Sequence, residues 1–279
     1  MTEKRPNSKR HLDLAIERAF GRSSNPLQIR GIMANTIIGQ LLPSGAVKGG
    51  SALKLRYGYA MTRFTTDLDT ARNANLSEYT ADLEAALKKG WNGFTGRLVT
   101  KKPASPKNIP AEYVMKPYEV KLEYNGKSWI TVPLEIGHDE IGDTAQPDFL
   151  ITDDVVSIFS KLSFPDPMPV PLLPIHHQIA QKLHALSSTK SERAHDLIDL
   201  QLIIKRETIT YPLLNATCYR LFKSRHQQEW PPVITKGASW DNLYTSQTGD
   251  LPVIKNVTDA LVWVNSLISE ICRSSDCVL

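Results

Sequence analysis

One short segment constrains the fold of this chain more than any other, because it joins a glycine pair to two closely spaced aspartates. Residues 46–48 are typical of a short strand, and Gly49-Gly50-Ser51 then predicts a turn into a helix. Residues 64–70 predict a second strand, with Asp67 and Asp69 near its end. Side chains at positions i and i+2 of a strand point to the same face, so both carboxylates are expected to converge on one spot.

This pattern suits a site for metal and phosphate. Two carboxylates that face one exposed point repel each other, and a hard cation such as Mg²⁺ (or Mn²⁺) removes that repulsion while it binds substrate phosphates. The Gly49-Gly50 turn lets the backbone approach a triphosphate closely, and Ser51 offers a hydroxyl and an N–H at a helix start, where anions bind. The segment is not a P-loop, since no Lys-Ser/Thr pair follows at the required spacing. A glycine turn with an unrelated surface Asp-x-Asp is the structural alternative.

A third carboxylate is expected from a hairpin around Asn125-Gly126, a dipeptide typical of tight turns between strands. Glu135 lies on the second arm between apolar residues, where a charge without a partner is unfavourable. As a third metal ligand it would also act as general base. The alternative is an edge-strand glutamate that faces solvent, which Pro133 favours. Four acids that follow closely could take its place: Asp139, Glu140, Asp143 and Asp148.

The chain changes character at residues 164–174, which hold five prolines and predict neither a helix nor a central strand. We interpret this stretch as the boundary between an α/β domain, residues 1–164, and a helical domain, residues 165–279. A short apolar run at 155–159 predicts a further strand. Beyond the boundary, helices are expected near 175–187, 193–205, 211–223 and 257–273.

The helical half carries one candidate cluster of charged residues. Lys182 lies on one predicted helix, and Asp196 and Asp199 share a face of the next. A lysine supported by an aspartate suits the binding of a triphosphate, whereas a structural ion pair between helices is the alternative. His184 and His195 have no Cys or His neighbours at ligand spacing and are expected to be structural.

Composition narrows the class of protein. The 279 residues are 41% hydrophobic, contain no apolar run of eighteen, and begin without the apolar segment of a secretory signal. These features predict a cytoplasmic protein without a membrane span. The three cysteines fit neither a zinc site nor a disulfide framework. The net charge of +4, with cations crowded into residues 4–30 and 97–107, permits a nucleic acid partner, and an ordinary solvated surface is the alternative.

Two motifs resemble those of a known family. Residues 48–53 and 63–69 resemble the opening motif of the AbiEii/AbiGii toxin family of nucleotidyltransferases, which includes the bacterial MenT toxins, and residues 182–200 resemble its later motif. The resemblance implies the DNA polymerase β superfold: an α/β (α+β) mixed sheet flanked by helices, followed by a helical C-terminal half. Residues 1–164 would then be the nucleotidyltransferase domain, and residues 165–279 the helical domain that completes the nucleotide site. The chain departs from the family at His195, where a Lys or Arg often precedes the aspartate, and in a longer gap between Ser51 and Asp67.

The resemblance also implies a function. The protein would move an NMP from an NTP to an RNA acceptor, the tRNA 3′ end, and so inhibit translation as part of a toxin–antitoxin or abortive-infection system with an antitoxin encoded nearby. Carried over by position, the implied residues are Gly50 and Ser51 for phosphate, Asp67 and Asp69 for metal, Lys182 for the triphosphate and Asp196 for catalysis or for the orientation of Lys182. Two other functions stay open: transfer to a protein or a small molecule such as an aminoglycoside, and a non-catalytic NTP-binding module.

Overall fold

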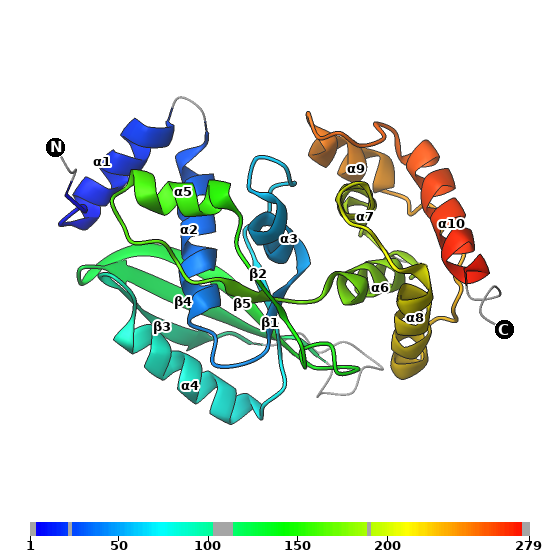
Figure 1. Cartoon of the computed structure of the whole chain (residues 1–279), viewed down its shortest axis with the longest axis horizontal. Coiled ribbons are helices and arrows are strands. Elements are labelled where there is room, and N and C mark those ends of the chain that lie inside the picture. The colour runs from blue at the N-terminus through cyan, green and yellow to red at the C-terminus, as the bar shows by residue number, and fades with distance from the viewer. Residues whose placement is uncertain (1–3, 22–23, 103–113, 189–190, 275–279) are drawn as a thin grey trace. The chain divides into compact units, whose positions relative to one another are not determined.

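The computed structural model describes residues 4–21, 24–102, 114–188 and 191–274. Contacts divide the chain into two compact units, Met1–Leu173 and Pro174–Leu279. The first unit contains the sheet, and the described part of the second contains helices and connecting segments (Figure 1).

The first unit is a mixed α/β structure. Its helices are α1 (Lys9–Phe20), α2 (Pro26–Gln40), α3 (Gly49–Tyr57), α4 (Leu76–Lys89) and α5 (Asp153–Lys161). Its strands are β1 (Ala46–Lys48), β2 (Leu68–Arg72), β3 (Phe94–Thr100), β4 (Lys116–Tyr124), β5 (Lys127–His138), β6 (Asp148–Leu150) and β7 (Val170–Leu172). They form one seven-stranded sheet in the order β3-β4-β5-β2-β1-β7-β6. In this sheet β2 runs parallel to β5 and β1 to β7, and the other neighbouring pairs are antiparallel.

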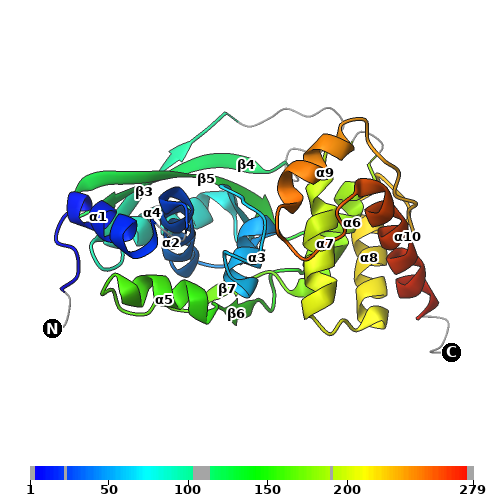
Figure 2. The same ribbon diagram turned by 90° about the horizontal axis from the view of Figure 1, so that it is seen from above.

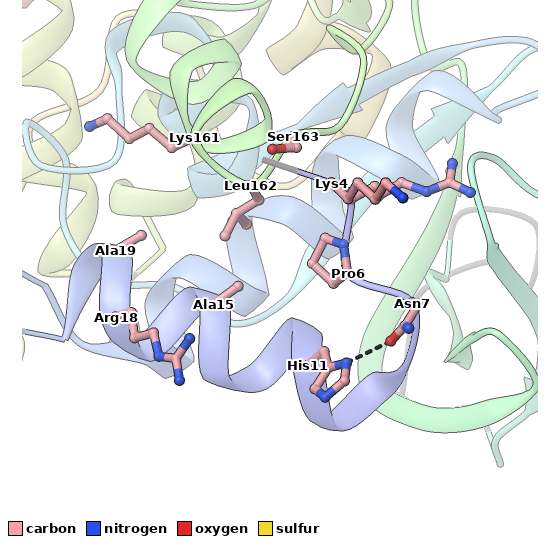
Figure 3. A pocket seen from close by; sticks show the side chains of 11 residues that line it. Lys4, Pro6, Asn7, His11, Ala15, Arg18, Ala19, Lys161, Leu162 and Ser163 are labelled. Carbon is pink, nitrogen blue, oxygen red and sulfur yellow. Dashed lines mark hydrogen bonds between the residues drawn. The ribbon is translucent and has the colours of Figure 1, made fainter. Parts of the chain in front are cut away.

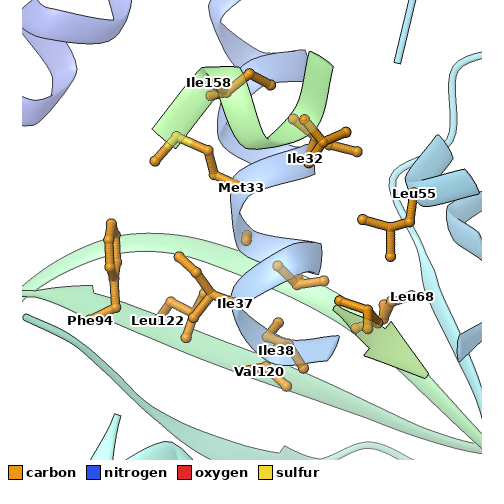
Figure 4. Packing of buried hydrophobic residues seen from close by; sticks show 14 of the residues in the cluster. Ile32, Met33, Ile37, Ile38, Leu55, Leu68, Phe94, Val120, Leu122 and Ile158 are labelled. Atoms are coloured by element: carbon orange, nitrogen blue, oxygen red, sulfur yellow. The ribbon is translucent and has the colours of Figure 1, made fainter. Parts of the chain in front are cut away.

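The core of this unit is built around α2. Figure 4 shows Met33 beside Ile158 of α5, while Ile37 and Ile38 lie over Leu122 of β4. All five side chains are buried, because α2 packs against the sheet on one side and against α5 on the other. Burial of each such side chain stabilises the fold by about 1.5–3 kcal/mol.

The helices cover one face of the sheet. In Figure 2, α1, α2 and α5 lie on the same side of β5. Along β5, buried Leu134 and Ile136 alternate with exposed Pro133 and Glu135. The apolar residues therefore face the helices, and the opposite face of this strand is accessible to a substrate.

The predicted hairpin is confirmed. Asn125 and Gly126 connect β4 to β5, and both have positive φ angles, 48° and 73°. A type I′ turn needs positive φ at both central residues, which asparagine and glycine tolerate. The turn sets the register of the pairs next to it, and a bulge in β5 between Ser128 and Ile130 then shifts the pairing by one residue before the strand reaches Glu135.

Two predictions about short segments were wrong. Residues 155–159 are not a strand but part of α5, because Val155, Ile158 and Phe159 follow the i, i+3, i+4 spacing of a buried helix face. The proline-rich stretch contains β7, which lies between β1 and β6. Pro171 fits there because no hydrogen bond to β1 is lost. The N–H of Leu173 donates to the Val47 carbonyl, so an N–H at position 171, two residues earlier, would face residue 45, which precedes the first residue of β1.

The helices of the second unit are α6 (Ile175–Leu186), α7 (His195–Arg206), α8 (Tyr211–Arg225), α9 (Trp240–Thr248) and α10 (Val257–Arg273). The four predicted helices are confirmed, and α9 was not predicted. Buried Trp240 begins α9, and its indole N–H donates to the Ser191 carbonyl at 2.6 Å. This is a tertiary contact without a local sequence signal. In the described ranges, no helix is both long and apolar enough to cross a membrane.

Candidate active site

The glycine pair lies where β1 runs directly into α3. Gly49 has a φ of +66° and is the first residue of α3, so Gly49-Gly50-Ser51 forms the first helical turn and not a separate turn before it. A Cβ on Gly49 would lie 2.3 Å from Oδ2 of Asp69, so the carboxylate packs against the bare backbone. Arg63 lies nearby, since its Nη2 is 3.2 Å from the position a Cβ on Gly50 would take. The start of α3, where N–H groups lack helical partners, therefore adjoins both an acid and a guanidinium.

The two aspartates occupy different local structures. Residues 64–70 were predicted to be a strand, but β2 begins at Leu68, so Asp67 precedes the strand and Asp69 lies within it. Leu68 is fully buried, Asp69 is half-buried and Asp67 is exposed. The segment before β2 is held against α3 as a loop, because the buried Lys54 ammonium donates to the Thr65 carbonyl at 2.6 Å.

Ser51 fixes the backbone of Asp67. Its hydroxyl is buried, donates to the Asp67 carbonyl at 2.5 Å and accepts a hydrogen bond from Asn35 Nδ2 at 3.0 Å. In this structure the hydroxyl thus orients the aspartate, and its role as a phosphate ligand stays a prediction. Asn35 was missed from the sequence. Its signal is an amide within the mostly apolar run at residues 32–39 of α2.

Sheet register aligns three charged residues on one face. Lys48 of β1 pairs with Asp69 of β2, and Asp69 pairs with Glu135 of β5. Directly paired residues of neighbouring strands present their side chains on the same face, about 4.5–5.5 Å apart at Cβ. Lys48, which the sequence analysis did not select, also extends past Gly137, where a Cβ would lie 3.0 Å from its Nζ. A cation and two acids therefore lie in a row across the sheet.

Asp67 and Glu135 both line a cavity of about 310 Å³. Lys101, Lys102 and Glu119 also line it. The Lys101 ammonium lies 2.8 Å from the Glu119 carboxylate, and this hydrogen bond is the main reason that the pKa of Glu119 lies below its usual value. The cavity thus combines the acids that a metal needs with lysines that suit phosphate groups.

Of the four alternative third acids, two make specific contacts away from this row. The Asp139 carboxylate accepts from the main-chain N–H groups of Gly142 and Asp143, and Asp148 pairs with Arg56 at 2.5 Å. Burial, followed by a hydrogen bond with Asp139 and its charge, raises the pKa of Asp143 to about 7. Glu135 alone among these candidates pairs in register with Asp69, which favours it as the third acid.

The residues fit a hard cation by their chemistry. Within the described residues, no three His, Cys, Asp or Glu side chains are grouped closely enough to hold a metal ion by themselves. Asp69 and Glu135 are nevertheless neighbours across β2 and β5, and Asp67 shares a cavity with Glu135. Carboxylate oxygens suit Mg²⁺, which keeps waters and substrate phosphates as further ligands and therefore needs few protein side chains.

In the second unit, Lys182 of α6 is enclosed by two aspartates of α7. Its Nζ donates to Oδ1 of Asp196 at 2.7 Å and to Oδ2 of Asp199 at 2.6 Å. The side chains of the three residues are 5%, 0% and 1% exposed. Asp199 is thus an equal partner of the lysine, beside the predicted Asp196. Arg193, half exposed, donates from Nε to the other oxygen of Asp196 at 2.8 Å.

This cluster holds Asp196 in its charged form. Burial by itself would raise the pKa of the carboxyl, but the positive charges of Lys182, Arg193 and His195 outweigh it, and the pKa lies below its usual value. The structural alternative, an ion pair between helices, is therefore present in the structure. Whether Lys182 also contacts a triphosphate stays a prediction.

Comparison with known proteins places the chain in a family. A sequence model of the family described as nucleotidyl transferase AbiEii toxin of the type IV toxin–antitoxin system matches residues 33–260. The chain belongs to the AbiEii family of nucleotidyltransferase toxins. This confirms the family inferred from the two motifs and, with it, a nucleotidyltransferase toxin. A search of curated protein sequences found no match.

The solved structure of MenT4 supports the predicted fold class. MenT4, a nucleotidyltransferase toxin from Mycobacterium tuberculosis, matches with a TM-score of 0.53 and 16% identity, over 94% of this chain and 98% of its own. JHP933 from Helicobacter pylori matches with a TM-score of 0.47 and 16% identity, over 91% and 95% of the two chains. At such identity the likeness to MenT4 shows the fold, and the mixed α/β nucleotidyltransferase architecture is confirmed.

Replacing Gly49 with alanine tests the contact between α3 and Asp69. The new Cβ would collide with the carboxylate, and a displacement of about 1 Å at such a site can lower the rate about 10²-fold. Gly126→Ala is the matched control, because Gly126 also has positive φ but a Cβ there would meet nothing within 4 Å. We expect both variants to lose similar stability on thermal unfolding and only Gly49→Ala to lose NMP transfer. Equal activities would contradict the contact.

Proposed function

We propose that this AbiEii-family protein transfers an NMP from an NTP to the 3′ end of tRNA and thereby inhibits translation. The observation that carries the proposal is the alignment of Asp69 with Glu135 beside Gly49, with Asp67 in the cavity that Glu135 lines. An antitoxin encoded nearby would restrain the activity, as the type IV toxin–antitoxin description of the family implies.

The proposed reaction breaks a phosphoanhydride bond of the NTP and forms a phosphodiester bond to the RNA. The oxygen of an RNA hydroxyl attacks the α-phosphorus of the NTP, the bond to pyrophosphate breaks, and the Glu135 carboxylate accepts the hydroxyl proton. Asp67 and Asp69 would hold Mg²⁺ (or Mn²⁺), which neutralises triphosphate charge when it is bound. The backbone of Gly49 and Gly50 would approach the phosphates, with Lys48 nearby. Alignment and charge neutralisation supply most of the rate enhancement in such reactions.

A cation-rich cavity supports RNA as the acceptor. About 610 Å³ in volume, it lies between α1, the residues before it and the end of α5 (Figure 3). Apolar side chains such as Ala15 and Leu162 form part of its wall, and the described residues that line it include no acid. Figure 3 shows basic side chains at its edges. The basic residues that line it are Lys4, Arg5, His11, Arg18 and Lys161. Such a surface suits the sugar–phosphate backbone of a nucleic acid.

Incubation with labelled NTPs tests the function directly. The full chain is mixed with tRNA, Mg²⁺ and each of the four α-labelled NTPs in turn, and label is followed into RNA, protein and free nucleotide. We expect one or more NTPs to label tRNA, and chelation of the metal or the double change Asp67→Asn and Asp69→Asn to abolish it. Label on protein, or on an added aminoglycoside, without label on RNA would reject RNA as the acceptor.

The cation-rich cavity makes a prediction about salt. The double change Arg18→Gln and Lys161→Gln should weaken tRNA binding. The slope of log affinity against log salt should become less negative by about 0.7–0.9 for each phosphate that the protein no longer neutralises. The matched control is Lys88→Gln with Lys89→Gln on α4, which removes the same charge from outside the cavity. Fluorescence anisotropy across a salt series measures both slopes. A slope equal to that of the wild type would exclude RNA phosphates from this cavity.

A further inference from the structure

A second cavity, about 570 Å³ in volume, lies in the helical unit at the end of α8. The helix ends at Arg225, and His226 adopts a left-handed backbone with φ of 52°, which turns the chain back. Residues 227–230 then return beside α8, and together with the last turns of the helix they line the cavity. The nucleotidyl transfer proposed above uses none of these residues.

Aromatic rings form one part of this cavity. Trp230 is held in place, since its indole N–H donates to Asn215 Oδ1 at 2.7 Å and its ring meets buried Phe222 edge-on, with centroids 5.3 Å apart. Tyr219 is 56% exposed, which is unusual for so large a ring. The Lys223 ammonium lies 5.9 Å from its centroid. Fixed rings beside a lysine are the elements with which proteins stack unpaired bases and hold their phosphates.

A glutamine gives the cavity a polar recognition group. The Oε1 atom of Gln228 is buried and has no hydrogen-bond partner among the described residues. A buried amide oxygen in this condition is unfavourable until a donor reaches it. The glutamine amide matches the N6 and N7 edge of adenine, because its oxygen accepts from N6 and its nitrogen donates to N7.

We propose that this cavity binds an unpaired adenine base of RNA, stacked on Tyr219 and read by Gln228, with Lys223 against the adjoining phosphate. The volume suits one nucleotide. The choice of RNA rests on the proposed function, because a free adenine nucleotide presents the same base. The cavity would thus add a base-specific contact on the helical unit to the phosphate contacts of the first unit.

Equilibrium binding without NTP or metal tests this proposal. Fluorescein-labelled oligo(A) and oligo(U) of equal length are titrated with the full chain at a salt concentration that screens phosphate contacts. We expect oligo(A) to bind about tenfold more tightly than oligo(U), Tyr219→Ala to weaken oligo(A) about tenfold, and Gln228→Leu to remove the preference for oligo(A). Phe149→Ala, which removes an exposed ring from β6, should change nothing.

Three results would overturn the proposal. They are equal binding of the two oligomers, binding that Tyr219→Ala leaves unchanged, and competition by AMP at the affinity of oligo(A), which would identify a free nucleotide as the ligand. The outcome is separate from that of the proposed function. An inactive transferase can still prefer oligo(A), and label transfer to tRNA by a chain without this preference would leave the proposed function standing.

Discussion

Replacing Asp69 with asparagine is expected to lower NMP transfer by about 10²–10³-fold, the loss typical when one electrostatic contact to the reacting groups is removed. Asparagine has nearly the same size but no charge, so it holds a cation against a triphosphate much less strongly than aspartate does. Asp69 is half-buried, pairs in register with Lys48 and Glu135, and touches the backbone at Gly49. Initial rates with labelled NTP and tRNA measure the effect.

The control for this experiment is Asp82→Asn, which removes the same charge from the exposed surface of α4. We expect Asp69→Asn to match the wild type in circular dichroism and in unfolding midpoint, since the substitution leaves the packing of Leu68 intact. If Asp69→Asn kept more than half of the wild-type rate while Asp67→Asn also stayed active, the aspartates would not form the catalytic centre, and a non-catalytic NTP-binding module would be favoured.

The second prediction with a large effect concerns the free energy of unfolding of the helical unit. Lys182→Met should destabilise it by about 3–5 kcal/mol, because Asp196 and Asp199 would remain as two buried carboxylates without their common cation. The triple change Lys182→Met, Asp196→Asn and Asp199→Asn removes the charges together and should recover most of that stability. Urea unfolding followed by fluorescence measures both variants. A single variant as stable as the wild type would contradict the buried cluster.

The same triple variant separates structure from catalysis. If it folds stably and transfers NMP at the wild-type rate, the cluster is only structural. If it folds stably but no longer transfers NMP, at least one of the three residues contributes to the reaction beyond its structural role.

The loss of stability at acid pH gives an independent measure of the buried cluster of Lys182, Asp196 and Asp199. The pKa of Asp196 is lower in the folded chain than its ordinary value of 3.8, so its contribution to stability is present above about pH 3.8 and is lost as the pH falls through the lower, folded value. Unfolding midpoints recorded from neutral pH downwards should therefore fall less steeply for Asp196→Asn than for the wild type. Parallel curves would show that Asp196 makes no such contribution.

Local chemistry made several parts of this protein predictable from sequence. Asn125-Gly126 determined a type I′ hairpin, because few residue pairs accept positive φ twice. Apolar patterning predicted the helices α6, α7 and α10 of the second unit. The segment with the glycine pair and the two aspartates, together with the later motif at residues 182–200, resembled the family closely enough to identify it. Residues 155–159 show the limit, because a short apolar run fits a strand and a buried helix equally well.

The tertiary structure decided which residues distant in the chain meet. Register between β2 and β5 placed Glu135 beside Asp69, and packing of α2 on α3 brought Asn35 to Ser51 and so to the backbone of Asp67. Packing of α6 against α7 likewise brought Lys182 to Asp199. Sequence determines local backbone preferences through sterics that act over a few residues. Pairings across the sheet and between helices depend on the simultaneous packing of the whole core, which no single segment encodes.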